Sequence, residues 1–374
     1  MTFIADTRMR RPGSWLNRLI ATPSFQDLAV RVPGIRRLAR RDGAEIFEIV
    51  QGFVKSQVLY ALVSLDIPER MLDRPVSVDA LALTIDIPTD RLGILMQAGA
   101  GLGLFRLRRD GRFALTRKGA ALVGVPGLKQ MILHHGAYYR DMSDPVVLLK
   151  GGVDTELARF WPYVFGATGD ANPEITETYS NLMAQSQRMV AKDTLSAVPL
   201  AGVKHLMDVG GGLGAFLSEV SKSNPTLKLT LYDLPAVMPS ARARLLKLGL
   251  DDRIELTGGS FKDEALPRGA DAISLVRVLY DHRDETVKEL LAKVYAALPP
   301  GGRLIISEPM SGGRSPDPIT DVYFAFYTLS MQTGRTRSAA DIKELCGRAG
   351  FVDIRALRPR RSFVTSVMTA RKPE

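Results

Sequence analysis

The ten residues His205–Gly214, HLMDVGGGLG, decide the fold of this chain. Their apolar first half is typical of a short buried strand, and apolar residues resume with helical spacing at Ala215–Val220. The glycines between these two segments let the backbone approach a ligand with no side chain in the way, and they tolerate positive φ. The stretch therefore predicts a strand, a tight glycine-rich turn and a helix whose N-terminus faces a ligand.

The turn by itself fits two cofactors. The spacing in Gly210–Ala215 matches the dinucleotide fingerprint G-x-G-x-x-A. A strand, a glycine turn and a later acidic residue also describe a site for S-adenosylmethionine (SAM), and Asp233 at the end of the predicted strand Leu227–Tyr232 is that acid. Asp208 favours SAM, because a carboxylate beside the turn suits an ammonium and a sulfonium group and would repel a pyrophosphate.

The composition indicates an ordinary globular protein. The chain has 374 residues, enough for two domains, with 45% hydrophobic and 24% charged residues. It contains no apolar run long enough for a transmembrane helix. Because Cys346 is the single cysteine, we expect no internal disulfide, no cysteine-type zinc site, no metal cofactor and a cytoplasmic location.

The N-terminal segment carries most of the net charge of +10. Residues 1–41 hold nine arginines against two aspartates, with Trp15, Leu16, Leu19 and Ile20 among the apolar residues between them. A basic segment with interleaved apolar residues suggests peripheral contact with an anionic membrane. A solvated, partly disordered tail is the alternative, and the sequence leaves the two open.

Residues 77–123 are predicted as two helices followed by a hairpin, the order of a winged helix. Ser77 is a helix N-cap, and Asp110-Gly111 is the hairpin signal. Arginines around the hairpin could contact phosphates, but the second helix, Asp90–Leu104, is mostly apolar and offers little to read base edges. We therefore expect a packing or dimerisation role and no nucleic-acid partner.

Residues 128–200 are predicted to be mainly helical. They are rich in aromatic residues and methionine, which either fill a core or line a cavity for a large apolar substrate. The residues in question are His134, His135, Tyr138, Tyr139, Trp161, Tyr163, Phe165, Met183, Ser186 and Met189.

From Lys204 onward, strands and helices alternate, which predicts an α/β domain with a parallel sheet. A terminal antiparallel strand pair is more typical of SAM methyltransferases than of nicotinamide dehydrogenases. The expected strands are His205–Val209, Leu227–Tyr232, Ile254–Thr257, Ala272–Val278, Arg303–Ser307, Val352–Leu357 and Phe363–Thr369, and the expected helices are Ala215–Ser223, Val237–Leu248, Glu285–Leu298 and Ala339–Ala349.

Six strings occur in the order and spacing of one family: LMDVGGGLGAF, LYDLPAV, GGSF, LVRVLYDHRDE, LPPGGRLIISEPM and GRTRSAADIKELCGRAGF. The chain resembles class I SAM-dependent O-methyltransferases of the caffeic acid and acetylserotonin type. The resemblance implies a homodimer, with a basic extension at 1–43, a helical winged-helix dimerisation and substrate-lining domain at 44–200, and a Rossmann-like SAM-binding catalytic domain at 201–374.

The resemblance also implies the cofactor site. The acidic residue and glycines of the turn face the methionine end of SAM, the acid after the second strand binds the ribose, and the next loop holds the adenine. The residues carried over are Asp208, Gly210, Gly212, Asp233, Leu234, Ser260 and Phe261. The family usually has Asp where Ser260 stands, which predicts a weaker contact with the adenine amino group.

The catalytic positions depart from the family. Members that act on phenols have a histidine base where this chain has Tyr280, and Thr336 stands where a second carboxylate would flank it; Glu308 matches the first. A phenol with an ordinary pKa near ~10 is a poor base at neutral pH. We therefore expect Tyr280 to orient the acceptor hydroxyl, with His282 or Glu308 taking the proton. A surface-loop place for His282 is the alternative.

Within the family, the Tyr280 substitution, the GRTRS string and the basic extension resemble a carotenoid branch of purple bacteria, which methylates the tertiary hydroxyl of an acyclic hydroxy-carotenoid. A bacteriochlorophyllide C-methyltransferase of the same family also carries tyrosine there and is the alternative. A non-enzymatic SAM-binding regulator is a third reading. The carotenoid reading implies a cytoplasmic protein peripheral to the inner or photosynthetic membrane.

Overall fold

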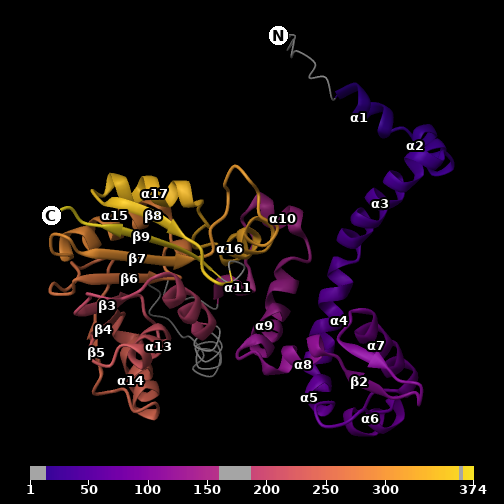
Figure 1. Cartoon of the computed structure of the whole chain (residues 1–374), viewed down its shortest axis with the longest axis horizontal. Helices are drawn as coiled ribbons and strands as arrows, with labels where there is room; N and C mark the ends of the chain where they lie inside the picture. Colours follow the sequence, from indigo (N-terminus) through magenta and orange to yellow (C-terminus); the bar gives the residue numbers. More distant parts are fainter. Residues whose placement is uncertain (1–13, 160–186, 362–364) are drawn as a thin grey trace. The chain divides into compact units, whose positions relative to one another are not determined.

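The computed structural model describes residues 14–159, 187–361 and 365–374 (Figure 1). The chain forms two compact units, Met1–Lys118 and Gly119–Glu374, which are described separately below. Compactness thus assigns residues 119–200 to the same unit as the C-terminal sheet. The sequence predicts domain boundaries at 43/44 and 200/201, and these boundaries stay predictions. The aromatic and methionine positions from Trp161 to Ser186 lie outside the described residues.

The first unit begins with helices. Its helices before the winged-helix segment are α1 (Ser14–Ile20), α2 (Pro23–Arg31), α3 (Pro33–Val50), α4 (Gly52–Ser64) and α5 (Ile67–Arg70). The basic extension is therefore helical from Ser14, and α3 begins at Pro33, where a proline at the first helical position fits. The α4 helix ends before Asp66, whose φ of 55° stops the helix.

A winged-helix segment completes this unit and confirms the predicted order. It comprises α6 (Val78–Ile85), α7 (Thr89–Gly101), β1 (Phe105–Leu107), β2 (Phe113–Leu115) and α8 (Arg117–Gly124), the last of which spans the division between the units. The Ser77 side chain caps α6 by accepting the Ala80 N–H, and Gly111 turns the hairpin with a φ of 77°. Leu92 and Met96 of α7 are fully buried.

The second unit is built on a seven-stranded sheet in the order β5-β4-β3-β6-β7-β9-β8. The first five strands are parallel and β9 pairs antiparallel with β8, as predicted. The antiparallel pairing of β9 with β7 joins this pair to the sheet. The strands are β3 (His205–Val209), β4 (Lys228–Asp233), β5 (Ile254–Gly258), β6 (Ala272–Val276), β7 (Arg303–Glu308), β8 (Val352–Leu357) and β9 (Ser366–Arg371).

Helices cover both faces of this sheet. They include α13 (Ala215–Ser223), α14 (Met238–Lys247), α15 (Asp284–Ala297), α17 (Ala339–Arg348) and a helix over 187–197. Alternate β3 residues enter different cores: Met207 packs with residues of α15 and α17, and Leu206 packs with residues of α13 and α14. This period of two fixes which strand-end side chains reach each face.

A third group of elements carries the aromatic residues of this unit. It comprises α9 (Leu128–Asp141), α10 (Pro145–Lys150), α11 (Glu156–Arg159), the π-helical turn η4 (Thr320–Phe324) and α16 (Ala325–Met331). Residues of α9, α11 and α16 share a buried cluster with Tyr280, which lies on the short 3-10 turn η3 (Leu279–Asp281). Short π-helical turns are rare and occur often at functional sites.

Among the described residues, no single helix is long and apolar enough to cross a membrane; only α3 and α4 together, bent by 45° where they meet, reach that length and composition.

Candidate active site

The glycine-rich turn connects β3 to α13 beside the end of β4. Gly210, with φ of 69°, donates its N–H to the Tyr232 carbonyl oxygen at 2.8 Å, and Gly212, with φ of 57°, donates its N–H to Oδ2 of Asp233 at 2.7 Å. A Cβ atom at Gly212 would meet open space, whereas one at Gly210 would lie 2.9 Å from Val278. The turn therefore leaves bare backbone beside open space at Gly212, and the ligand expected there stays a prediction.

Asp208 lies under this turn and is 1% exposed. Its Oδ1 accepts a hydrogen bond of 2.6 Å from the Ser274 hydroxyl, and its Oδ2 lies 2.8 Å from where a Cβ atom on Gly211 would be. Burial raises the pKa of Asp208 to about 7, the Ser274 hydrogen bond opposes that rise, and the Asp233 carboxylate adds to it. A bound cation would therefore favour ionisation of this carboxyl group near neutral pH.

Asp233 ends β4 at the same edge of the sheet. Its two carboxylate oxygens accept the N–H groups of Gly212 and Leu234, each at 2.7 Å. Burial raises the pKa of Asp233, and these two backbone donors oppose the rise. Asp233 pairs in register with Gly258 of β5. The loop that carries Ser260 therefore begins beside Asp233, and the Ser260 hydroxyl donates to Oδ2 of Asp263 at 2.7 Å.

His282 packs against Phe261, which the family resemblance places at the adenine. The two ring centroids are 5.2 Å apart and the rings are nearly perpendicular, at 81°. His282 is buried, so the surface-loop alternative for it is wrong. Burial, together with the positive charges of Lys262 and Arg337, lowers the pKa of His282 to about 4. The imidazole is therefore neutral near pH 7.

Tyr280, Asp281 and Glu308 form a buried polar group where β7 ends beside η3. The backbone N–H of Tyr280 donates to Oε2 of Glu308 at 3.2 Å. Burial raises the pKa of Glu308 to about 7 against the opposing effects of Arg337 and backbone N–H groups. Burial also raises the pKa of Tyr280 well above 10 and that of Asp281 well above its ordinary value. Sequence reasoning expected Glu308 in this place and did not find Asp281.

Arg277 faces this group from the end of β6. Its φ of 58° is unusual for a residue with a Cβ atom, and its N–H donates to the Ser307 carbonyl oxygen of β7 at 2.8 Å. Its guanidinium carbon lies 6.0 Å from the centroid of the Phe324 ring. The charge of Arg277 lowers the pKa of both Asp281 and Tyr280 against the larger effect of burial. A positive φ at a residue with a Cβ atom is costly, and backbone strain of this kind is concentrated at functional sites.

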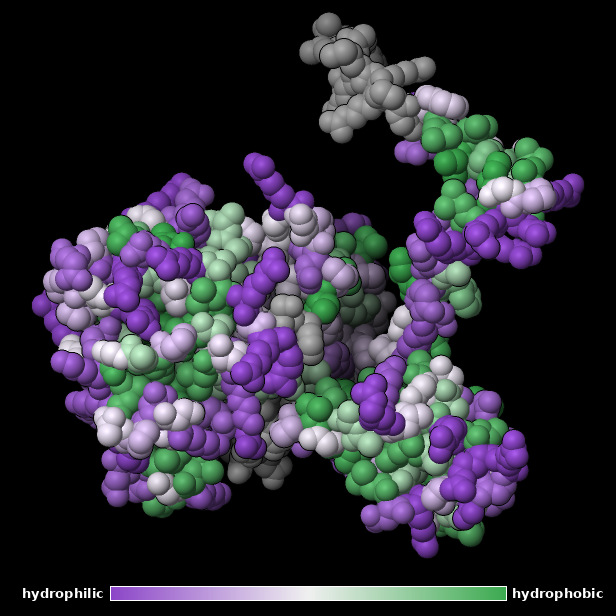
Figure 2. All heavy atoms as spheres, viewed as in Figure 1, coloured by the Kyte–Doolittle hydropathy of each residue, from purple (hydrophilic) through white to green (hydrophobic). Residues whose placement is uncertain are grey.

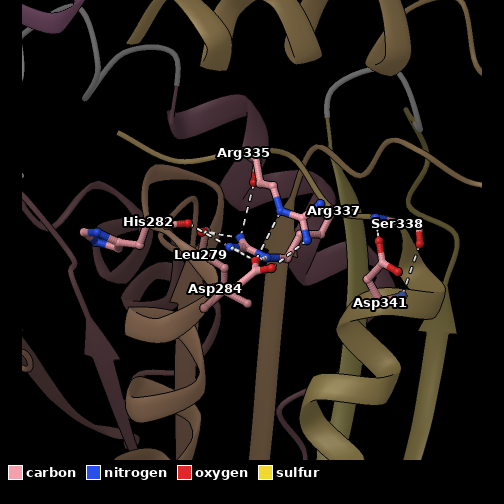
Figure 3. Close-up of polar contacts among 7 residues, drawn as sticks. All are labelled: Leu279, His282, Asp284, Arg335, Arg337, Ser338 and Asp341. Carbon is pink, nitrogen blue, oxygen red and sulfur yellow. Dashed lines mark hydrogen bonds and ion pairs between the residues drawn. The ribbon is translucent and has the colours of Figure 1, made fainter. Parts of the chain in front are cut away.

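Arg337 fixes η3 in place (Figure 3). Its fully buried guanidinium donates to the carbonyl oxygens of Leu279 and His282, both at 2.8 Å, and pairs with Asp284 at 2.7 Å. Figure 3 shows the His282 ring directed away from the guanidinium while its carbonyl faces it. Thr336, at the family's second carboxylate position, is buried and hydrogen-bonded to the Ser311 hydroxyl.

An aromatic cluster from α9, η4 and α16 packs around Tyr280. Tyr323 and Tyr327 stack with ring centroids 6.0 Å apart, and Tyr138 meets the Tyr327 ring edge-on at 5.5 Å. The Tyr327 hydroxyl and His134 Nε2 are hydrogen-bonded at 2.8 Å. Sequence reasoning proposed Tyr138 and His134 from α9 and missed Tyr323 and Tyr327, because a tyrosine four residues from another on a helix is usual in a core.

The comparison with known families decides what this arrangement is. Residues 139–352 match the model of the O-methyltransferase domain, and residues 47–124 match the O-methyltransferase dimerisation domain. The chain belongs to the O-methyltransferase family. It is an S-adenosylmethionine-dependent O-methyltransferase, with the N-terminal helical dimerisation domain and C-terminal sheet-and-helix domain that the sequence predicts. The dimerisation domain supports a homodimer.

Two curated relatives align along nearly the whole chain. The demethylspheroidene O-methyltransferase of Cereibacter sphaeroides is 53% identical over 95% of this chain and 94% of its own length. The enzyme of the same name from Rhodobacter capsulatus is 48% identical over 97% of this chain and 91% of its own. The structure of human N-acetylserotonin methyltransferase in complex with SAM has the same fold, with a TM-score of 0.74 at 22% identity, covering 89% of this chain and 98% of that one.

Proposed function

We propose that this protein transfers the methyl group of SAM to the tertiary hydroxyl of an acyclic hydroxy-carotenoid of the demethylspheroidene type. The main support for this proposal is the sequence identity of 53% and 48%, over nearly the full length, to two enzymes named for that substrate. The replacement of a histidine base by Tyr280, buried and with its pKa raised well above 10, supports an acceptor that is an alcohol rather than a phenol.

The residues at the glycine-rich turn fit SAM. Asp208 and the backbone of Gly210 and Gly212 would hold the methionine end, and Asp233 would accept hydrogen bonds from the ribose. Leu234, Ser260 and Phe261 would surround the adenine. When bound, SAM supplies an electrophilic methyl carbon on a sulfonium sulfur. The open space at Gly212 and the buried Asp208 carboxyl group support this placement.

We expect SAM affinity to rise several-fold between pH 6 and pH 7.5. The raised pKa of Asp208, about 7, means that the unliganded carboxyl group is mostly protonated at pH 6 and mostly ionised at pH 7.5. A cationic ligand prefers the ionised form, so binding releases a proton and strengthens as pH rises. Below pH 7.5 the amino group of SAM stays largely protonated.

Isothermal titration calorimetry in two buffers of different ionisation enthalpy measures both the affinity and the released proton. Asp208→Asn should bind SAM more weakly at pH 7.5 and lose the pH dependence. A wild-type dissociation constant that is flat from pH 6 to pH 7.5 would contradict the role given to Asp208.

At the acceptor end, Tyr280 would orient the hydroxyl group and Glu308 would take part in removing its proton. His282 was the other proton acceptor expected from the sequence. Its contact with Phe261 and its pKa of about 4 instead support a place beside the adenine. The cluster of Tyr138, Tyr323 and Tyr327 around Tyr280 supports a large apolar substrate, because stacked aromatic rings bind flat or linear conjugated chains well.

A methyl-transfer assay tests the function. Purified full-length protein is given labelled SAM and one of two detergent-dispersed acceptors, an acyclic 1-hydroxy-carotenoid or a bacteriochlorophyllide. Label in the carotenoid ether is the expected result. Label in the chlorin alone would instead identify the C-methyltransferase, and SAM binding without transfer to either acceptor would favour the non-enzymatic regulator.

We further propose that α1–α3 bind an anionic membrane surface from which an apolar substrate would be drawn. Trp15 is 65% exposed, Leu28 55% and Leu38 51%, and arginines lie between them. Figure 2 shows apolar and strongly hydrophilic residues side by side on these helices. An exposed apolar helix face bordered by arginines suits the boundary between acidic headgroups and acyl chains.

Replacing Arg36, Arg37 and Arg40 by glutamine should weaken binding to phosphatidylglycerol-containing vesicles about tenfold or more, since each basic residue near such a surface contributes about 1 kcal/mol. The matched control replaces Arg106, Arg108 and Arg109 of the hairpin, which removes the same charge. Vesicle flotation at two salt concentrations measures binding. Equal losses in the two variants, or binding insensitive to salt, would refute contact through α3.

A further inference from the structure

We infer that Asp141 is a positioning residue for the acceptor end of the active site, because its carboxylate joins the three helices whose side chains surround Tyr280. The inference rests on the proposed function, since it takes the aromatic rings around Tyr280 as the place where the acceptor binds. Three observations carry it: the hydrogen bonds to this one carboxylate, the distance along the chain between the segments that they join, and the buried side chains that these segments bring to Tyr280.

The Asp141 carboxylate lies where three helices meet. Asp141 is the last residue of α9, and its Oδ1 accepts the N–H of Glu156 at 2.6 Å. Its Oδ2 accepts the N–H of Leu157 at 3.0 Å and the Ser330 hydroxyl at 2.6 Å. Glu156 and Leu157 begin α11, and Ser330 lies near the end of α16. One carboxylate thus contacts groups that are 15, 16 and 189 residues away along the chain.

The three donors need both oxygens of an ionised carboxylate. Two of them are backbone N–H groups, which cannot become acceptors, and they face different oxygen atoms of Asp141. An asparagine amide has one oxygen and two N–H donors, so in either orientation it would turn an N–H group toward one of these backbone donors. Ser330 is fully buried. A donor that loses its acceptor there cannot turn to water, which makes the loss costly.

The same helices carry side chains that enclose Tyr280. Tyr138 comes from α9, Leu157 from α11 and Tyr327 from α16, and all three are buried in one cluster with Tyr280. The α11 helix contacts both α9 and α16 (Figure 1). Leu157 is fully buried, and its own backbone N–H is one of the groups that Asp141 binds. Tyr138 lies three residues before Asp141, about one helical turn, so a shift of this carboxylate reaches the rings directly.

Two other hydrogen bonds join these helices in pairs. His134 and Tyr327 connect α9 to α16 at 2.8 Å. The hydroxyl of Thr155, the residue before α11, donates to the Ser330 carbonyl oxygen of α16 at 2.6 Å. Asp141 contacts α11 and α16 at once from the end of α9, so its replacement loosens all three helices. The loss of one pairwise bond would leave the other contacts in place.

The test compares Asp141→Asn with Asp144→Asn, which removes the same charge three residues later. Asp144 is exposed, and its Oδ1 alone accepts the N–H groups of Val146 and Val147 at the start of α10. An asparagine oxygen can replace that single acceptor, whereas it cannot replace both oxygens of Asp141. The control therefore separates the contact among three helices from the loss of one carboxylate near α9.

For Asp141→Asn, the Michaelis constant for the hydroxy-carotenoid should rise about tenfold, because the rings would bind the conjugated chain equally in the ground state and the transition state. Its turnover number at saturating acceptor and its SAM dissociation constant should stay within about threefold of wild type, and Asp144→Asn should match wild type. A Michaelis constant for Asp141→Asn within about threefold of wild type would overturn the inference. An equal loss of SAM affinity would also overturn it, because the change would then have loosened the whole unit.

Hydrogen exchange gives a readout that needs no acceptor. In Asp141→Asn the backbone amides of α16 should exchange faster than in wild type, since α16 loses a contact with α9, while those of α13 should keep their wild-type rates. Ser330→Ala, which removes one of the three donors, should show the same pattern more weakly. Unchanged exchange in α16 of Asp141→Asn would overturn the inference. Wild-type protein that methylates neither acceptor would instead refute the proposed function, and the exchange rates would still show whether Asp141 joins the helices.

Discussion

Replacing Arg337 by methionine should lower the free energy of unfolding by about 3–5 kcal/mol, the usual cost of removing one partner of a buried ion pair. Methionine keeps the length of the side chain and removes its donors. Two carbonyl oxygens, of Leu279 and His282, would lose the partners they have at 2.8 Å in the interior. The capping box between Ser338 and Asp341 that starts α17 is untouched by this change.

A matched control lies two residues away. Arg335 pairs with the same carboxylate, Asp284, at 2.7 Å, but its side chain is 58% exposed and that of Arg337 is 0% exposed. Arg335→Met should cost less than about 1 kcal/mol, as exposed ion pairs generally do. The difference between the variants therefore measures burial and the carbonyl contacts rather than the loss of one positive charge.

Urea unfolding followed by circular dichroism, at one protein concentration because a dimer's stability depends on it, gives both values. Turnover should fall in Arg337→Met even where the protein stays folded, because η3 carries Tyr280. Similar unfolding midpoints for Arg335→Met and Arg337→Met would contradict the assigned role. A stable Arg337→Met variant with wild-type turnover would do so as well.

The sequence predicts the sheet well because its signals are local. A strand of period two or a continuous apolar run, followed by glycines or an acid, identifies β3, β4 and β5 to within about two residues. The N-cap at Ser77 follows from one hydroxyl side chain, and the hairpin turn at Gly111 follows from a residue that lacks a side chain. The position of Asp233 beside Gly212 follows from the parallel pairing of the strands that precede them.

The acceptor side could not be predicted in the same way. Asp281 sits in a charged run, Asp281–Glu285, that is typical of a solvated loop, yet tertiary packing leaves it only 7% exposed. The positive φ of Arg277 could not be predicted from the sequence, because arginine has no preference for that conformation. Tyr323 of η4 and Tyr327 of α16 lie far in sequence from Tyr138 of α9, so their contacts with it depend on tertiary structure alone.

Gly334→Ala should reduce turnover about a hundredfold while SAM affinity stays within a fewfold. A Cβ atom at Gly334 would overlap backbone atoms of η3 and its exit: the Tyr280 carbonyl oxygen, the Asp281 carbonyl carbon and the His282 nitrogen. Because these are main-chain atoms, no side-chain rotation relieves the overlap, and the two segments must separate. A shift of about 1 Å in a positioning segment can cost about a hundredfold in rate.

The expected stability cost is moderate, about 1–3 kcal/mol for overpacking, so the variant should remain folded and assayable. Gly313→Ala is the control, because a Cβ atom at Gly313 would meet no atom within 4 Å. Steady-state turnover with saturating SAM and a titration of SAM binding separate the two ends of the site. Asp208 and Asp233, the residues proposed to bind the cofactor, lie on β3 and β4 and make no contact with Gly334. A fall in SAM affinity as large as the fall in turnover would therefore contradict the view that Gly334 positions only the segment carrying Tyr280 and Asp281.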